Sequence, residues 1–148
     1  MGNAAPDDER HLHRAFELAE TARSAGNRPF GSLLVSESGE VLREASNTTL
    51  TENDITAHPE LKLARWAAQE LDPAAARTTT MYTSCEPCPM CTGAIKRSGL
   101  GRVVYGFPSA ELEALRERTG KTTTWPVAFD GPALVDEARA ILERYYAP

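Results

Sequence analysis

Apolar residues at helical spacing over residues 8–25 form the first clear pattern in the chain. One helical face carries Leu12, Ala15, Phe16, Ala19 and Ala22. This pattern predicts an amphipathic helix, which Gly26 ends. Two short β-prone runs follow at residues 32–36 and 40–43, with a Ser-Gly turn between them. They predict a β-hairpin.

The rest of the chain alternates helix-prone and strand-prone segments. Helices are predicted at residues 58–71, 92–98, 110–118 and 132–146, and strands at 79–84, 102–105 and 125–129, the last weakened by Pro126. Such alternation is typical of an α/β fold with helices on both faces of a sheet. We therefore expect a single three-layer α/β/α domain over residues 1–148. Its sheet should be mixed, with about five strands, because the opening hairpin is antiparallel.

The net charge of the chain argues against nucleic acid as a binding partner. The chain of 148 residues has a formal net charge of −5 and a pI of about 5.2. A protein that binds by neutralising many phosphates is normally basic, so we expect a small-molecule substrate and no nucleic acid. The opening residues lack the apolar run of a signal peptide, and no segment approaches the ~20 apolar residues that span a bilayer. We expect a cytoplasmic protein without membrane contact.

Three cysteines, Cys85, Cys88 and Cys91, crowd into one short segment. An odd, clustered set in a chain of this kind favours metal or redox chemistry over disulfides. Cys88 and Cys91 lie one helical turn apart, and His58 begins an earlier predicted helix. A catalytic zinc ion takes three such protein ligands and leaves its fourth position for water. Glu60 is then placed to act beside the metal without binding it.

These residues form a two-part motif, H-x-E at His58–Glu60 and P-C-x-x-C at residues 87–91, which is the signature of zinc deaminases. The chain resembles the cytidine deaminase-like superfamily over about residues 12–106. Residues 83–91 resemble guanine deaminases, and residues 101–106 are similar to tRNA adenosine deaminases. The resemblance implies a Zn²⁺-dependent hydrolytic deaminase of a free nucleobase or related amino-heterocycle, of the guanine, cytosine or aminotriazine type. Glu60 would move the protons of that reaction.

The same resemblance implies a substrate pocket and an assembly. Family landmarks match at residues 29–31, at Asn47 and at residues 56–58. They imply that Asn47 hydrogen-bonds the substrate and that Phe30 and Ala57 belong to its pocket. They also imply a homodimer.

Pro59 departs from the family pattern, which usually has alanine or glycine between the histidine and the glutamate. The backbone N–H at that position commonly contacts substrate in such families, and proline has none. Our hypothesis is that this site depends less on a substrate carbonyl at that point and shifts toward amino-substituted rings. An ordinary first-turn proline without functional meaning is the alternative.

Other readings of these residues stay open. The cysteines could form a structural zinc module for protein association, although Cys85 is more simply a packed thiol than a fourth ligand. Nucleosides or the adenosine of tRNA could be the substrate, but residues 107–148 carry seven acidic against five basic side chains, which should repel RNA. Trp125, Tyr145 or Tyr146 could cap the pocket or pack elsewhere. His11 and His13 are expected to be solvated.

Overall fold

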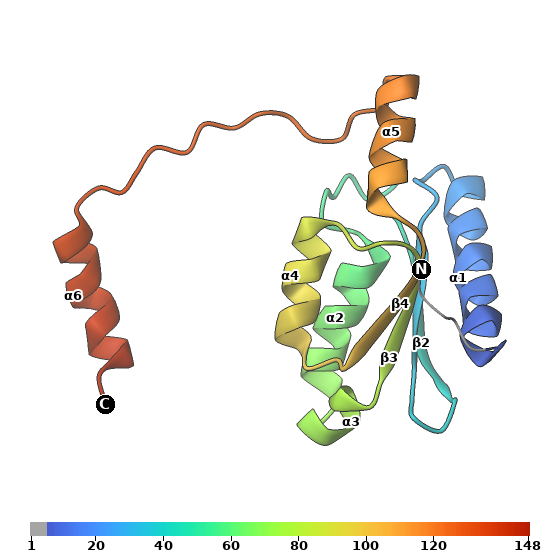
Figure 1. Cartoon of the computed structure of the whole chain (residues 1–148), viewed down its shortest axis with the longest axis horizontal. Coiled ribbons are helices and arrows are strands. Elements are labelled where there is room, and N and C mark those ends of the chain that lie inside the picture. The colour runs from blue at the N-terminus through green and yellow to red at the C-terminus, as the bar shows by residue number, and fades with distance from the viewer. Residues whose placement is uncertain (1–5) are drawn as a thin grey trace.

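The computed structural model describes residues 6–148 as a four-stranded sheet with helices on both of its faces (Figure 1). The strands are β1 (Gly31–Val35), β2 (Val41–Ser46), β3 (Thr80–Cys85) and β4 (Arg102–Phe107). The helices are α1 (Pro6–Ser24), α2 (Pro59–Glu70), α3 (Pro73–Arg77), α4 (Pro89–Ser98), α5 (Ser109–Thr119) and α6 (Val135–Tyr146). The α/β class and the three layers predicted from the sequence are confirmed.

The sheet has the order β2-β1-β3-β4 and is mixed, as expected. Strand β1 is antiparallel to both β2 and β3, whereas β3 and β4 run parallel. The expected number of about five strands is wrong, because residues 125–129 form no strand. Pro126 has no N–H to donate, and Trp125 is 73% exposed with no neighbouring strand to pair with.

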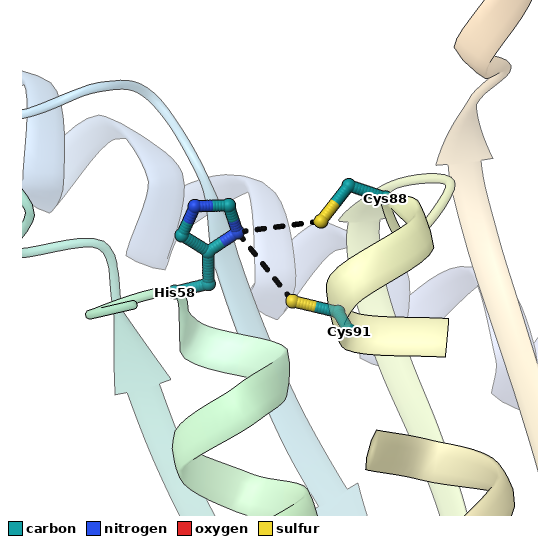
Figure 2. A group of neighbouring side chains, drawn as sticks. All are labelled: His58, Cys88 and Cys91. Atoms are coloured by element: carbon teal, nitrogen blue, oxygen red, sulfur yellow. Dashed lines mark hydrogen bonds between the residues drawn. The ribbon is translucent and has the colours of Figure 1, made fainter. Parts of the chain in front are cut away.

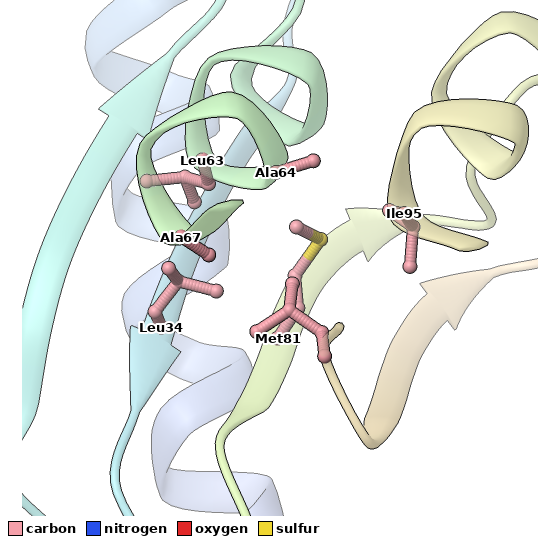
Figure 3. Packing of buried hydrophobic residues seen from close by; sticks show 7 residues of the cluster. Leu34, Leu63, Ala64, Ala67, Met81 and Ile95 are labelled. Carbon is pink, nitrogen blue, oxygen red and sulfur yellow. The ribbon is translucent and has the colours of Figure 1, made fainter. Parts of the chain in front are cut away.

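Two apolar clusters hold the layers together, and the alternation of side chains along β1 and β3 separates them. Leu34 and Met81 are cross-strand partners that face α2 and α4, where they meet Leu63, Ala67 and Ile95 (Figure 3). All of these side chains are buried. Strand β1 is buried along its whole length, as expected for a strand covered on both faces.

The second cluster lies under α1, where Leu33 and Tyr82 of the sheet meet Ala15 and Leu18 of the helix. Gly31 allows this close approach, because a Cβ atom there would lie 2.5 Å from the backbone nitrogen of Ala19. The absence of a side chain therefore lets α1 lie directly on β1.

The start of α1 is anchored to the sheet by a buried polar network. Asp8 accepts from the hydroxyl of Tyr82 at 2.6 Å and pairs with both terminal nitrogens of Arg102, at 3.0 and 2.8 Å. The His11 ring packs against the Tyr82 ring, with centroids 4.8 Å apart and the ring planes tilted by 42°, and is buried. The expectation that His11 is solvated is therefore wrong, whereas His13 is exposed as expected.

The chain beyond α5 leaves the body of the molecule. Residues 120–134 run away from the sheet, and α6 stands apart from the other helices (Figure 1). No residue of α5 or α6 is buried. Within residues 6–148, no helix is long and apolar enough to cross a membrane.

Candidate metal centre

The three predicted ligands come from the first turns of two neighbouring helices. His58 is the N-cap residue of α2 and Cys88 is the N-cap residue of α4, both in extended conformation, and Cys91 lies one turn into α4. Proline follows each N-cap residue, where its fixed φ suits the first helical position and its missing N–H costs nothing. The two prolines thus help to bring two helix N-termini to one point.

The ligand atoms are spaced as a zinc ion requires. Nδ1 of His58 lies 3.7 Å from Sγ of Cys88 and 3.4 Å from Sγ of Cys91, and it faces both sulfurs (Figure 2). All three atoms lie within 4.8 Å of one another. Ligands at ordinary Zn–N and Zn–S bond lengths in a tetrahedron are separated by about 3.5 Å. These residues therefore fit a zinc ion bound through Nδ1 and two thiolates, with a fourth position open.

The sulfur atoms of Cys88 and Cys91 affect each other's protonation. A hydrogen bond from Cys91, assisted by one from His58, lowers the pKa of Cys88 below its ordinary value. The pKa of Cys91 is raised, because its proton is held by the neighbouring Cys88 sulfur and its surroundings are buried. The Cys88 hydrogen bond in turn raises the pKa of His58. Without a metal, Cys88, Cys91 and His58 share protons through these hydrogen bonds. A divalent cation would stabilise both cysteines as thiolates.

Glu60 lies in the first turn of α2, two residues beyond His58, and is only 6% exposed. Burial raises its pKa to about 7, although a hydrogen bond from its own backbone N–H opposes this. The Ser32 hydroxyl, 3.5 Å from Oε1, is itself fixed by a 2.7 Å hydrogen bond to Thr83. A carboxyl group whose pKa lies near neutrality can both accept and return a proton.

A cavity of about 730 Å³ opens beside the ligands. Its walls come from α4, α5, the loop after β3 and the start of α2. The lining residues are Phe30, His58, Glu60, Cys85, Glu86, Pro87, Cys88, Pro89, Thr92, Gly93, Lys96, Ser109, Leu112, Glu113, Arg116 and Thr124. His58 and Cys88 thus share this lining with Glu60 and Phe30, whereas the third predicted ligand, Cys91, is buried and does not line the cavity.

The other two residues expected to bind substrate are not part of this lining. Asn47 and Ala57 are buried and do not line the cavity. Oδ1 of Asn47 accepts from the N–H and the hydroxyl of Thr49, which fixes the amide. The backbone N–H of Asn47 donates to the carbonyl of Phe30. Asn47 is therefore tied to the wall residue Phe30, and its role in substrate binding stays a prediction.

Several further predictions concern the same region. Cys85 lines the cavity but lies outside the three-ligand cluster, and burial raises its pKa to about 11. Pro59 is fully buried and does not line the cavity. Tyr145 and Tyr146 are exposed on α6, so neither caps this cavity within one chain.

Sequence reasoning missed the α5 wall, including Glu113 and Arg116. The one available signal was an arginine on the same helical face as Leu112.

Comparison with known proteins agrees with this site. Residues 5–107 match the family described as the cytidine and deoxycytidylate deaminase zinc-binding region. A probable cytosine deaminase of Schizosaccharomyces pombe is 31% identical over 88% of this chain and 87% of its own length. A tRNA-specific adenosine deaminase of Haemophilus influenzae is 33% identical over 75% of this chain, which spans 64% of that relative.

The solved structures lead to the same family. The crystal structure of guanine deaminase from Bacillus subtilis superposes with a TM-score of 0.71 at 30% identity, over 95% of this chain and 94% of the other. The family match covers more than half of the chain and includes all three ligands. The chain therefore belongs to the cytidine and deoxycytidylate deaminase zinc-binding family and is a zinc-dependent deaminase.

Proposed function

We propose that this deaminase acts on a free nucleobase or a related amino-heterocycle and replaces its exocyclic amine with oxygen. The observation that carries the reaction is Glu60, a buried carboxyl group with a pKa of about 7 that lines the cavity beside the three ligands. Perturbed carboxyl groups in clefts are typical of general acid-base catalysts.

The proposed reaction consumes one water molecule and releases one ammonia. Zinc held by His58, Cys88 and Cys91 would lower the pKa of the attacking water. The water oxygen bonds to the ring carbon that carries the amine, and Glu60 accepts the proton that the water gives up. Glu60 returns this proton to the adjacent ring nitrogen. It then transfers the remaining water proton to the amine, so that the C–N bond breaks and ammonia leaves.

Phe30, Asn47 and Ala57 are proposed to hold the ring. Phe30 offers an apolar wall for a flat heterocycle. With Oδ1 engaged by Thr49, Asn47 has its NH₂ group left to donate to a substrate acceptor. The N–H of Thr48 donates to the carbonyl of Ala57 at 3.1 Å, so the segment that carries Asn47 is joined to the one that carries Ala57 and His58.

A free base is favoured over tRNA for two reasons. The probable cytosine deaminase is matched over 88% of this chain and 87% of its own, and the guanine deaminase over 95% and 94%, whereas the tRNA-specific adenosine deaminase is matched over 75% and 64%. The region beyond residue 106, which includes the α5 wall of the cavity, has an excess of acidic side chains. An RNA backbone would be repelled there.

We also propose that the chain forms a homodimer through residues 120–148. The side chains of Trp125, Phe129 and Tyr145 are 73%, 92% and 82% exposed, and Ile141 and Leu142 of α6 are exposed as well. Exposed apolar surface of this extent is typical of a protein interface. A second copy would bury it, and each large apolar side chain fully buried in this way contributes about 1.5–3 kcal/mol.

An ammonia-release assay over guanine, cytosine, adenine, their nucleosides, aminotriazines and a tRNA anticodon arm tests the substrate class. Release from a free base at rates well above those from nucleosides and RNA supports the proposal. Turnover of RNA alone, with binding that weakens steeply as salt rises, would replace it with the tRNA reading.

A further inference from the structure

The face of α5 that lines the cavity carries an arginine, Arg116. Three residues of this helix, Ser109, Leu112 and Arg116, are only partly exposed, and all three line the cavity. Their spacing places them on one helical face. The Arg116 side chain is 22% exposed, whereas Glu113 is 59% exposed. The inward face of a helix usually carries apolar side chains. A guanidinium on this face of α5 therefore indicates that the cavity binds a polar ligand.

A second contact fixes α5 over the site. The carboxylate of Glu86, in the loop between β3 and α4, accepts from both the N–H and the hydroxyl of Ser109. This loop also carries the ligand Cys88. The first turn of α5 is therefore tied to the segment that holds the metal ligand, and Arg116 projects into the cavity from a positioned helix.

The thiol of Cys85 lies close enough to two opposite charges to feel both of them. Burial is the main cause that raises the pKa of Cys85; the carboxylate of Glu60 raises it further, and the guanidinium of Arg116 lowers it. All three side chains line the cavity. A flat ring bound in this cavity would share its lining with both the catalytic carboxyl group and the guanidinium.

The guanidinium keeps donors for such a ring. A guanidinium carries five N–H groups in a planar fork. Among the described residues, Nη1 of Arg116 donates to Oε1 of Glu113 at 2.6 Å, and the side chain of Arg116 makes no other hydrogen bond. The ion pair fixes one edge of the group. The opposite edge can reach a carbonyl oxygen and a neighbouring ring nitrogen, which is the pair of acceptors that arginine recognises on guanine.

We infer that Arg116 determines specificity by donating to a carbonyl oxygen of the substrate ring. This inference rests on the proposed base deaminase activity and deepens it. The preferred substrates are amino-heterocycles that also bear an oxo group, such as a 2-amino-6-oxopurine. This preference for an oxo group replaces the hypothesis, drawn from Pro59, of a shift toward amino-substituted rings, because Pro59 is buried away from the cavity whereas Arg116 lines it. Glu113 acts as a positioning residue for the guanidinium.

The test compares matched substrates that differ in the carbonyl group, guanine with 2,6-diaminopurine and cytosine with 2,4-diaminopyrimidine. In Arg116→Met, kcat/KM for the oxo substrate should fall about 10- to 100-fold, mainly through KM, as expected for the loss of a charge-assisted hydrogen bond. The diamino substrate should change by less than about threefold. Arg118→Met, on the same helix but outside the cavity lining, is the matched control and should leave both unchanged.

Zinc content and the thermal transition of Arg116→Met are measured alongside the kinetics, and both should equal those of the wild type. An equal loss on the oxo and diamino substrates, or an unchanged oxo substrate, overturns the assignment of Arg116 and leaves the proposed function intact. Absence of ammonia from every base in the wild-type enzyme would instead remove the proposed function, and this inference with it.

Discussion

The carboxylate of Glu86 accepts two hydrogen bonds from Ser109, at 2.9 Å from the backbone N–H and 3.0 Å from the hydroxyl. The first residue sits in the loop that leads to Cys88, and the second begins α5. One side chain thus joins the segment that holds the metal to the helix that forms the far wall of the cavity.

Glu86→Ala should loosen that wall without disturbing the metal. We expect KM to rise about tenfold, because two hydrogen bonds to a carboxylate are lost, while zinc content stays unchanged. Ser109→Ala keeps the backbone donor and should raise KM by no more than about threefold. Steady-state kinetics with metal analysis measures both. A loss of zinc in Glu86→Ala would show that this contact supports the ligands rather than the wall.

Removal of residues 121–148 should convert a dimer into a monomer. The segment carries exposed apolar side chains, including those of Trp125 and Phe129, that only another surface can bury. Sedimentation equilibrium of the full-length and truncated chains measures the assembly, and far-UV circular dichroism checks that the sheet and its helices persist. A full-length chain that is monomeric at all concentrations contradicts the proposed homodimer.

Cys85→Ala should retain about one zinc ion per chain, because three protein ligands complete a catalytic site. Cys91→Ala should lose the metal, since its sulfur lies 3.4 Å from Nδ1 of His58 and belongs to the cluster. Atomic emission analysis after dialysis gives both stoichiometries. Loss of zinc from Cys85→Ala would make this cysteine a ligand and favour the closed, structural type of site.

The raised pKa of Glu60 should appear in the stability of the metal-free protein. Burial raises this pKa from 4.5 to about 7, so the folded state holds a proton that the unfolded chain releases within that range. The stabilisation is fully present below about pH 4.5 and is lost as the pH rises through about 7, for a total of about 3 kcal/mol.

Urea unfolding with a chelator present measures this effect. The free energy of unfolding of the wild type minus that of Glu60→Gln should fall by about 2.5 kcal/mol between about pH 5 and about pH 8. Subtracting the variant removes the contributions of the other titrating groups. A difference that does not vary with pH would mean that Glu60 keeps an ordinary pKa.

The metal centre could be predicted from the sequence because the residues in each half of its motif lie close together in the chain. His58 with Glu60, and Cys88 with Cys91, are each close in sequence, and both pairs lie at the start of a helix that good helix formers and a first-turn proline already indicate. The α/β layers followed from the alternation of helix-prone and strand-prone segments for the same reason.

The features that the sequence did not reveal depend on contacts between distant segments. His11 is buried because it packs against the ring of Tyr82, which lies far along the chain. Residues 125–129 have some strand propensity but no partner strand, so they remain extended and exposed. Arg116 belongs to the cavity only because α5 returns over the loop before Cys88.

The most direct test of the account is to measure zinc content and ammonia release together in Glu60→Gln. This change keeps the size of the side chain and removes its ability to take up a proton. The account predicts one zinc ion per chain, as in the wild type, and a rate of ammonia release reduced at least 100-fold on the best base substrate. Undiminished ammonia release with zinc in place would contradict it.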